Sequence, residues 1–361
     1  MGVKHKIYIL LLILIIALTG CRHFNSSDIN MAGISLADIR VHSSAAYYLS
    51  EEGILYSLGA DGDSSSYVLY KNSKKGIVAE NVKTFGEMTG GGYYISNSDE
   101  LYIWNRNVLP LYNYNYKDSH KMILQDVKYV AFESYFMVYI DKTNNLYLAG
   151  EFGEKSYSIE QSQLLGNDVT AVDVEDSTVI WAQNDGTIKS YGDIEIEKLD
   201  ISKVQESLNT SKIESILLEC DKLFVLQEGN LWFCGNYENL ITGSNNTNGF
   251  DVILLKQDII NVSSSINTVA GIDSQGAIYI WGKCLSNSLE DTKNPHYDYY
   301  EGYKAAIDAK SVYVSDGCFC YVDNSGNSKI FHANGPDGFY GNSTKDVYVG
   351  INREPVMWVD Y

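Results

Sequence analysis

The chain has 361 residues and carries 27 Lys and Arg against 46 Asp and Glu, so its formal net charge is −19. An excess of negative charge of this size disfavours nucleic acids and anionic membrane surfaces as partners. With 4 prolines but 30 glycines, the turns of the fold must depend on Gly, Asn and Asp.

The first 20 residues have the pattern of a targeting segment. Two lysines precede an unbroken apolar run over residues 7–17, which is shorter than the roughly 20 residues that a membrane span needs. The sequence LTGC at residues 18–21 follows, and it resembles the lipobox of bacterial lipoproteins. The resemblance implies a signal peptide over residues 1–20, a lipid on Cys21, and an extracytoplasmic chain anchored to the bacterial cell membrane. An uncleaved anchor helix is the alternative. Residues 21–32 are polar and are expected to form a lipidated tether.

A short apolar phrase recurs from residue 53 onward, for example GILYSLG at residues 53–59 and AIYIWGK at residues 277–283. The apolar anchors of the seven copies are, in chain order, Leu55, Leu101, Leu146, Ile188, Leu231, Ile278 and Ile330. Neighbouring anchors are between 42 residues (Leu146 to Ile188) and 52 residues (Ile278 to Ile330) apart. Periods of about 40–50 residues with strand-like content predict a β-propeller with one blade per repeat.

Each repeat is expected to supply strands of one blade. About 20 residues before each anchor, a polar residue precedes an apolar strand; these polar residues are Asp38, Asn81, Asp126, Asp168, Lys212, Asp258 and Lys310. A second apolar run and a tight turn such as Asp185-Gly186 follow, which is the pattern of a β-hairpin. Residues 198–208 could form one or two helical turns between blades. Repeats therefore start near residues 38, 81, 126, 168, 212, 258 and 308.

Residues 346–361 form a half-repeat that lacks an anchor. It carries the apolar residues 356–359, and we expect it to close the ring by completing a blade begun near the N-terminus, because an open sheet edge invites aggregation. The sequence thus predicts an all-β, seven-bladed propeller over residues 33–361, closed by this half-repeat. Whether residues 38–50 or 346–361 supply the strands at the seam stays open.

The repeat resembles that of the regulator of chromosome condensation family over residues 36–361. The shared order is an apolar strand, a second strand ending in an acidic residue, a glycine turn and a strand like LYxWG; Gln163–Gly166 is similar to the QLG element that often follows. The histidine that the family has in the second strand is missing, and Tyr47, Tyr93 and Val138 lie near its place. The resemblance implies the fold but not the function, since the family's members do different jobs. One secreted bacterial relative inhibits β-lactamases with one face of its ring, which offers an analogy for the mode of action.

The sequence contains no motif for catalysis, metal binding or a cofactor. It has no GxSxG, HExxH or P-loop pattern, and its histidines stand apart from one another. Gly90–Gly92 predicts the start of a strand where backbones approach closely. Asp61-Gly62-Asp63 predicts a plain turn, because a calcium loop needs six or more oxygen ligands in register. We therefore expect no cofactor, no metal, no catalytic residue and no enzymatic activity.

Five cysteines follow Cys21, namely Cys220, Cys234, Cys284, Cys318 and Cys320. An odd number leaves at least one unpaired outside the cytoplasm. Small buried core residues are the expected role. A disulfide between Cys220 and Cys234 is an alternative, because both fall in one repeat.

Tyrosine is abundant, with 29 residues, and two clusters lie outside the repeating phrase. Both clusters, and two single tyrosines, follow an anchor strand, so their connections should emerge on one side of the ring. Tyrosine gives a large contact area at a small cost in conformational entropy. The predicted binding residues are Tyr112, Tyr114, Tyr116, Tyr157, Tyr237, Tyr297, Tyr299, Tyr300 and Tyr303. The alternative is that these tyrosines cover blade edges.

Together these patterns predict a monomeric, lipid-anchored propeller that binds another protein through loops on one face. Its contact with the membrane is expected only through the lipid on Cys21, and no nucleic acid is expected as a partner. An envelope carbohydrate-binding or hydrolytic propeller is the alternative, which predicts paired carboxylates about 5–10 Å apart in a cleft beside Trp or Tyr. A passive scaffold is the second alternative.

Overall fold

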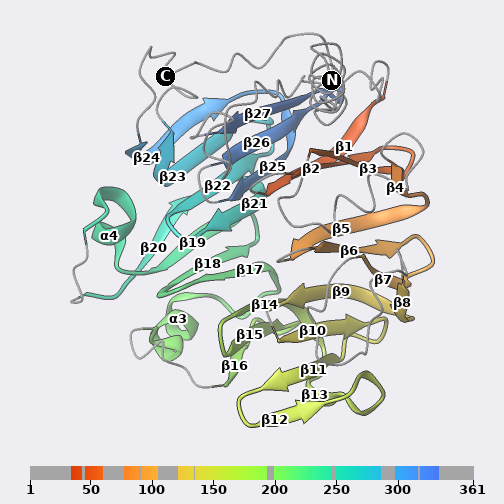
Figure 1. Ribbon diagram of the computed structural model, residues 1–361. Helices are drawn as coiled ribbons and strands as arrows, with labels where there is room; N and C mark the ends of the chain where they lie inside the picture. Colours follow the sequence, from red (N-terminus) through yellow and green to blue (C-terminus); the bar gives the residue numbers. More distant parts are fainter. Residues whose placement is uncertain are drawn as a thin grey trace, which may run out of the picture.

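The computed structural model describes residues 34–42, 45–59, 77–88, 91–104, 121–133, 135–192, 199–244, 249–285, 297–315 and 318–332. These residues form antiparallel sheets of consecutive strands, arranged around a common centre as a β-propeller (Figure 1). The prediction of an all-β propeller is therefore confirmed. The described strands fall into seven sheets, each containing one copy of the sequence repeat.

The first three sheets have the following strands: β1 (Leu36–His42), β2 (Ala45–Ser50), β3 (Leu55–Gly59) and β4 (Ile77–Ala79); β5 (Val82–Met88), β6 (Gly91–Ser96), β7 (Leu101–Trp104) and β8 (Lys121–Leu124); β9 (Val127–Phe132), β10 (Phe136–Asp141), β11 (Leu146–Phe152), β12 (Lys155–Tyr157) and β13 (Gln163–Gly166). A short 3₁₀ helix, η2 (Ile159–Gln161), lies between β12 and β13.

The other four sheets have these strands: β14 (Val169–Glu175), β15 (Thr178–Gln183) and β16 (Ile188–Gly192); β17 (Ile213–Glu219), β18 (Lys222–Gln227), β19 (Asn230–Gly235) and β20 (Asp251–Lys256); β21 (Ile259–Ser265), β22 (Thr268–Asp273), β23 (Ile278–Leu285) and β24 (Tyr297–Ala306); β25 (Ala309–Ser315), β26 (Cys318–Asp323) and β27 (Ser328–His332).

The second strand of a sheet is buried on both of its faces. In β18 and β22 every residue is buried, and in β10 and β15 only the last is not. Each sheet lies between two neighbours, so these strands read as continuous apolar runs and not as alternating ones. The anchors lie in the third strands, and those whose side chains are described are all buried: Leu55, Leu101, Leu146, Ile188, Leu231 and Ile278.

The polar residue before a first strand adopts a left-handed backbone. The residues in this place, with their φ angles, are Asn81 (64°), Asp126 (61°), Asp168 (54°), Asp258 (67°) and Asp308 (65°). Asn and Asp tolerate this conformation better than other side chains, which explains the recurring polar residue. Asp38 and Lys310 do not occupy this place, contrary to the prediction. The first sheet begins at Leu36, so Asp38 is the third residue of β1, and in the seventh sheet Asp308 has the role.

A backbone hydrogen bond joins each of these first strands to the preceding sheet. The N–H of Val82 donates to the carbonyl of Gly53 at 2.8 Å, and that of Ile259 donates to Gly229 at 2.8 Å. Leu36 donates in the same way to Gly326 of the last sheet, at 3.1 Å. The first and last sheets therefore lie side by side (Figure 1).

Side chains from both sides strengthen this contact between the ends of the ring. Lys310 Nζ lies 2.5 Å from Glu51 Oε1. Leu36 and Ile39 of β1 share one core cluster with Cys320 of β26. The described part of the chain thus closes by packing between the first and seventh sheets. The half-repeat at residues 346–361 lies outside the described residues, as do the segment with Cys21 and the Asp61–Asp63 turn.

Two short α helices lie between strands. α3 (Ile201–Ser207) falls within the predicted residues 198–208; Asp200 caps its N-terminus by accepting a hydrogen bond from the N–H of Lys203. α4 (Tyr237–Thr242) was not predicted; Asn236 caps it at the N-terminus, and Gly243 ends it with a φ of 69°. Within the described ranges, no helix has both the length and the apolar character to cross a membrane.

The predicted alternative of a disulfide concerns Cys220 and Cys234. Cys220 is exposed and Cys234 is buried, and no disulfide joins them, so that alternative is wrong. Cys284 and Cys320 are also buried, as expected of core residues. The side chain of Cys318 lies outside the described residues.

Two residues of the predicted Gly90–Gly92 segment begin β6, where Gly92 lies opposite Trp104 of β7. A Cβ atom on Gly92 would overlap the Trp104 indole, which accounts for glycine at this position.

Candidate functional site at the two faces of the ring

The strand pairing defines two faces of the propeller. Phe132 at the end of β9 pairs with Met137 of β10, and Phe136 of β10 pairs with Gly150 near the end of β11. The turns between first and second strands therefore share one side with the ends of the third strands; we call this side the tyrosine face. The starts of the first strands and the turns between second and third strands lie on the other side, the lysine face.

The predicted binding tyrosines have different environments. Tyr157 in β12, Tyr237 in α4, and Tyr299 and Tyr303 in β24 are half-buried. Tyr300 is buried, with 6% of its surface exposed. Tyr297 begins β24, but its side chain lies outside the described residues, as do Tyr112, Tyr114 and Tyr116.

The second tyrosine cluster is a strand and not a loop. Tyr300 pairs with Gly282 and Tyr303 with Ile280 across the β23–β24 ladder, which shifts register at a bulge near Gly302. Tyr300 belongs to a core cluster, and its ring centre lies 5.1 Å from that of Tyr303. Tyr300 is therefore a packing residue, and the expectation that it contacts a partner does not fit this placement.

Two other predicted tyrosines connect α4 to β24. The hydroxyl of Tyr237 donates to Glu301 Oε1 at 2.9 Å, and its ring lies 5.8 Å from that of Phe233. Burial and the Glu301 carboxylate raise the pKa of Tyr237 to about 12. The Tyr299 hydroxyl lies against Gly243, where a Cβ atom would overlap it. These contacts order this part of the tyrosine face.

Tyr157 belongs to a group of polar and aromatic side chains between the third and fourth sheets. Its hydroxyl interacts with that of Tyr191, which also donates to Gln163 Oε1 at 3.3 Å and lies 3.5 Å from Lys155 Nζ. The Tyr191 ring stacks on Phe152, with the ring centres 5.3 Å apart. This stack leads into a cavity on the same face.

The cavity has a volume of about 340 Å³ and combines aromatic rings with carboxylates. It is lined by Glu133, Tyr135, Phe136, Glu151, Phe152, Gly153, Asp176 and Ser177. Phe136 and Phe152 are buried and meet edge to face at 4.8 Å, whereas Tyr135 is 63% exposed. This site was not predicted from the sequence. One feature of the sequence could have indicated it. The turn between the first and second strands contains the aromatic residue Tyr135 in the third sheet, whereas the same turn of the fourth sheet contains the polar residues Asp176 and Ser177.

Carboxylates on the first strands join neighbouring sheets. Asp173 Oδ2 accepts a hydrogen bond from the N–H of Leu218 at 2.8 Å, and Glu219 Oε1 accepts one from Ser264 Oγ at 2.8 Å. Both partners are 45 residues further along the chain, which is one repeat. Burial raises the pKa of Asp173 to about 7 and that of Glu219 to about 8. These acids are thus already engaged in holding sheets together.

The first strand of the first sheet carries a charged pair. Arg40 Nε lies 3.8 Å from Asp38 Oδ2, and the guanidinium lies over the rings of Phe85 at 5.2 Å and Tyr313 at 5.8 Å. Burial raises the pKa of Asp38, although the positive charge of Arg40 opposes the shift. Arg40 therefore connects the first sheet to the second and the seventh.

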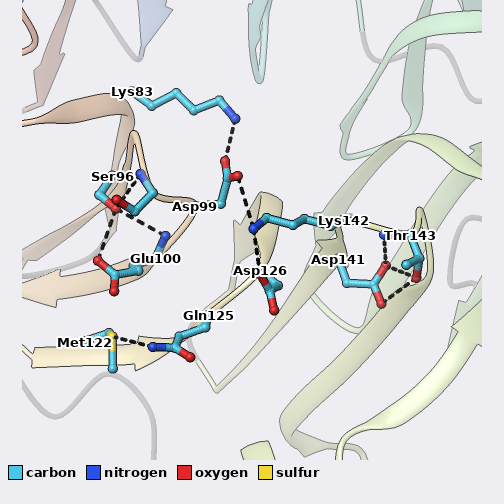
Figure 2. Close-up of polar contacts among 11 residues, drawn as sticks. Lys83, Ser96, Asp99, Glu100, Met122, Gln125, Asp126, Asp141, Lys142 and Thr143 are labelled. Atoms are coloured by element: carbon cyan, nitrogen blue, oxygen red, sulfur yellow. Dashed lines mark hydrogen bonds and ion pairs between the residues drawn. The ribbon is translucent and has the colours of Figure 1, made fainter.

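Ion pairs cross between the second and third sheets on the lysine face (Figure 2). Asp99 Oδ1 lies 2.8 Å from Lys83 Nζ, and Asp99 Oδ2 lies 3.6 Å from Lys142 Nζ. Lys142 Nζ also lies 2.6 Å from Asp126 Oδ1. The hydrogen bond to Lys83 is the main cause that lowers the pKa of Asp99. Among the described residues, no group of His, Cys, Asp or Glu is arranged to hold a metal ion.

The fold is similar to that of solved β-propellers. No family model matches the sequence, and no curated protein sequence matches it either. Solved structures do match. Prp20p from Saccharomyces cerevisiae, whose binding to Gsp1p and histones was studied, is 13% identical, with a TM-score of 0.54 and 84% of each chain covered.

Two other solved structures agree. Yeast RCC1 (Prp20) bound to Kap60 is 13% identical, with a TM-score of 0.52 and 78% of each chain covered. Human WBSCR16 is 13% identical, with a TM-score of 0.55, covering 78% of this chain and 85% of its own. The chain is therefore a β-propeller with the fold of RCC1.

Proposed function

We propose that this chain is a lipid-anchored, extracytoplasmic, seven-bladed propeller that binds another protein through its tyrosine face. The observation that carries the proposal is the 340 Å³ cavity, in which the exposed Tyr135 stands beside Glu133, Glu151 and Asp176. Protein interfaces are enriched in tyrosine and phenylalanine, and their strongest contacts cluster in pockets.

The lining of the cavity favours a basic side chain of the partner. Its exposed ring, Tyr135, presents a π-system that attracts cations, and its three acidic residues supply the opposite charge. The backbone N–H of Glu151 donates to the carbonyl of Tyr135 at 2.9 Å, so the two walls of the cavity are tied together. Such a site needs little ordering when a partner binds, which favours affinity.

The anchor and the number of blades belong to the same proposal. The LTGC sequence at residues 18–21 supports lipidation of Cys21 and a place outside the cytoplasm. The seven described sheets support seven blades, with residues 346–361 as the remaining half-repeat. The solved propeller Prp20, the yeast RCC1, binds proteins, which supports binding as the activity.

Capture of partners from a bacterial envelope extract on the immobilised protein tests the proposal. A specific partner should be retained by the wild type and lost with Glu151→Lys or Tyr135→Ala. Ile307→Ala is the control, because Ile307 is 66% exposed but lies on the lysine face. A partner that binds all variants equally would contradict the use of the tyrosine face, and the absence of any specific partner would favour a passive scaffold.

The carbohydrate-binding or hydrolytic alternative needs carboxylates that face one another across a cleft. Asp173 and Glu219 have raised pKa values, as catalytic acids often do, but each accepts a hydrogen bond from the adjacent sheet. For this reason we place protein binding first.

A further inference from the structure

A second cavity, of about 370 Å³, opens on the lysine face among the first strands of four consecutive sheets. It is separate from the proposed protein-binding cavity. The residues that give it its chemistry are Lys83, Lys128, Tyr129, Lys212 and Glu214. A volume of this size is within the range of small-molecule sites.

Two of its lysines occupy equivalent positions but have different partners. Lys83 and Lys128 are each the second residue of a first strand, and each reaches a turn residue 16 positions further on. Lys83 Nζ meets the Asp99 carboxylate at 2.8 Å, whereas Lys128 Nζ meets the amide oxygen of Asn144 at 2.5 Å. Asp99 neutralises Lys83, but the neutral Asn144 only positions Lys128 and leaves its charge uncompensated.

The third lysine replaces an acid. Lys212 precedes β17, in the place where the neighbouring repeats have Asp168 and Asp258. Among the described residues, neither Lys128 nor Lys212 has a carboxylate within ion-pair distance. Glu214 is the acidic residue of the lining. In a chain of net charge −19, a lining with three lysines and one acidic residue is locally positive.

The other walls are suited to the body of a small molecule. Tyr129 is 42% exposed into the cavity. The apolar side chains of Ile140, Val172 and Ile216 complete the wall. Charged groups beside apolar walls are the combination that binds amphipathic ligands.

We infer that this cavity binds a small organic anion. Its phosphate or carboxylate group contacts Lys128 and Lys212, and its apolar or ring portion lies against Tyr129. Electrostatic attraction is stronger here than at an open surface, because the walls exclude part of the water.

Isothermal titration calorimetry of the full chain tests the inference with three probes: phenyl phosphate, phenylacetate and inorganic phosphate. We expect one site, at which phenyl phosphate or phenylacetate binds more tightly than inorganic phosphate. Which of the two ring-bearing anions binds more tightly shows whether the site prefers a phosphate or a carboxylate group. Lys128→Gln and Lys212→Gln should each weaken binding about tenfold or more, because a charged hydrogen bond is lost.

Lys304→Gln serves as the control, since Lys304 is exposed in β24 and does not line the cavity. It should leave the affinity unchanged. The inference is overturned if no probe binds, or if the double variant Lys128→Gln with Lys212→Gln binds as well as the wild type. Circular dichroism of each variant checks that the fold is intact. Neither result depends on the protein partner proposed for the tyrosine face.

Discussion

The backbone N–H of Leu36 donates a hydrogen bond to the carbonyl of Gly326 at 3.1 Å. The bond repeats the one that joins Val82 to Gly53 and Ala309 to Gly276 within the continuous chain. The seam between the first and last sheets therefore uses the same contact as the junctions that chain connectivity supports. In a closed ring of this kind, every sheet has two neighbours.

This equivalence predicts that a change at the seam lowers the free energy of unfolding as much as the same change at an internal junction between sheets. Ile39 in β1 and Ile216 in β17 are both the fourth residue of a first strand, and both are buried. Each change to Ala should cost about 2–5 kcal/mol of unfolding free energy, measured by denaturant unfolding. A much smaller cost for Ile39→Ala would mean that the seam opens separately from the rest of the ring.

Burial of acids on the first strands predicts a dependence of stability on pH. Asp173 and Glu219 have pKa values of about 7 and about 8 in the folded chain, above the roughly 4 of unfolded carboxyls. Between pH 4 and pH 8, roughly, the folded state therefore binds more protons than the unfolded state does. The free energy of unfolding should then fall as pH rises from about 5 to about 8. Thermal unfolding at several pH values measures this loss.

The double variant Asp173→Asn with Glu219→Gln separates these two acids from all others. It keeps oxygen acceptors for Leu218 and Ser264 but cannot lose a proton. Its melting temperature should fall less between pH 5 and pH 8 than that of the wild type. Identical pH profiles would show that the two carboxyls titrate alike in the folded and unfolded states.

The left-handed residue before a first strand predicts a strong preference at that position. Asp258 has a φ of 67°, where a β-branched side chain is strained. Asp258→Val should destabilise the protein by about 1–2 kcal/mol, whereas Asp258→Asn should be nearly neutral. The comparison of melting temperatures checks this, and equal values for the two variants would rule out backbone strain as the reason for the recurring Asp and Asn.

Two tyrosines of different burial should respond in opposite ways. Tyr300 is in the core, so Tyr300→Ala should cost about 3–5 kcal/mol of stability, as for other large aromatic residues. Tyr135 is exposed, so Tyr135→Ala should change stability by no more than about 0.5 kcal/mol while weakening partner capture. If Tyr135→Ala unfolded the protein instead, its role would be structural.

Lipidation is tested at a single residue. Cys21→Ala should abolish labelling with a fatty-acid probe and block processing at this site, because the thiol is the atom that carries the lipid. The other five cysteines remain in that variant and serve as internal controls. Labelling that persists in Cys21→Ala would refute the lipoprotein assignment.

The architecture was predictable because the repeat reflects burial. Anchors such as Leu146 and Leu231 are fully buried in the third strands, so each repeat must keep an apolar residue there. The sequence shows the type of the recurring polar residue but not its exact position relative to the strand. For this reason the prediction that Asp38 and Lys310 precede a first strand is wrong. Only the strand pairing shows that Leu36 starts the first sheet.

The candidate sites were harder to predict, because each combines distant segments. Glu133 and Asp176 come from different sheets and meet only in the folded ring. The sequence YDYYEGYK at residues 297–304 is typical of a loop. In the structure it lies in strand β24, which pairs with β23 along the full length of β23. Helix α4 has only six residues, and its caps, Asn236 and Gly243, resemble turn residues in sequence.

The contact between Gly92 and Trp104 has a consequence for how such a chain can evolve. The indole occupies the space that a side chain on Gly92 would need, so a larger residue at one position requires a smaller one at the other. The same holds for Gly86 and Tyr93, which face each other across the preceding pair of strands. Although the repeats share a common pattern, they are not interchangeable modules: a blade duplicated or transplanted within this gene would have to carry both members of such a pair.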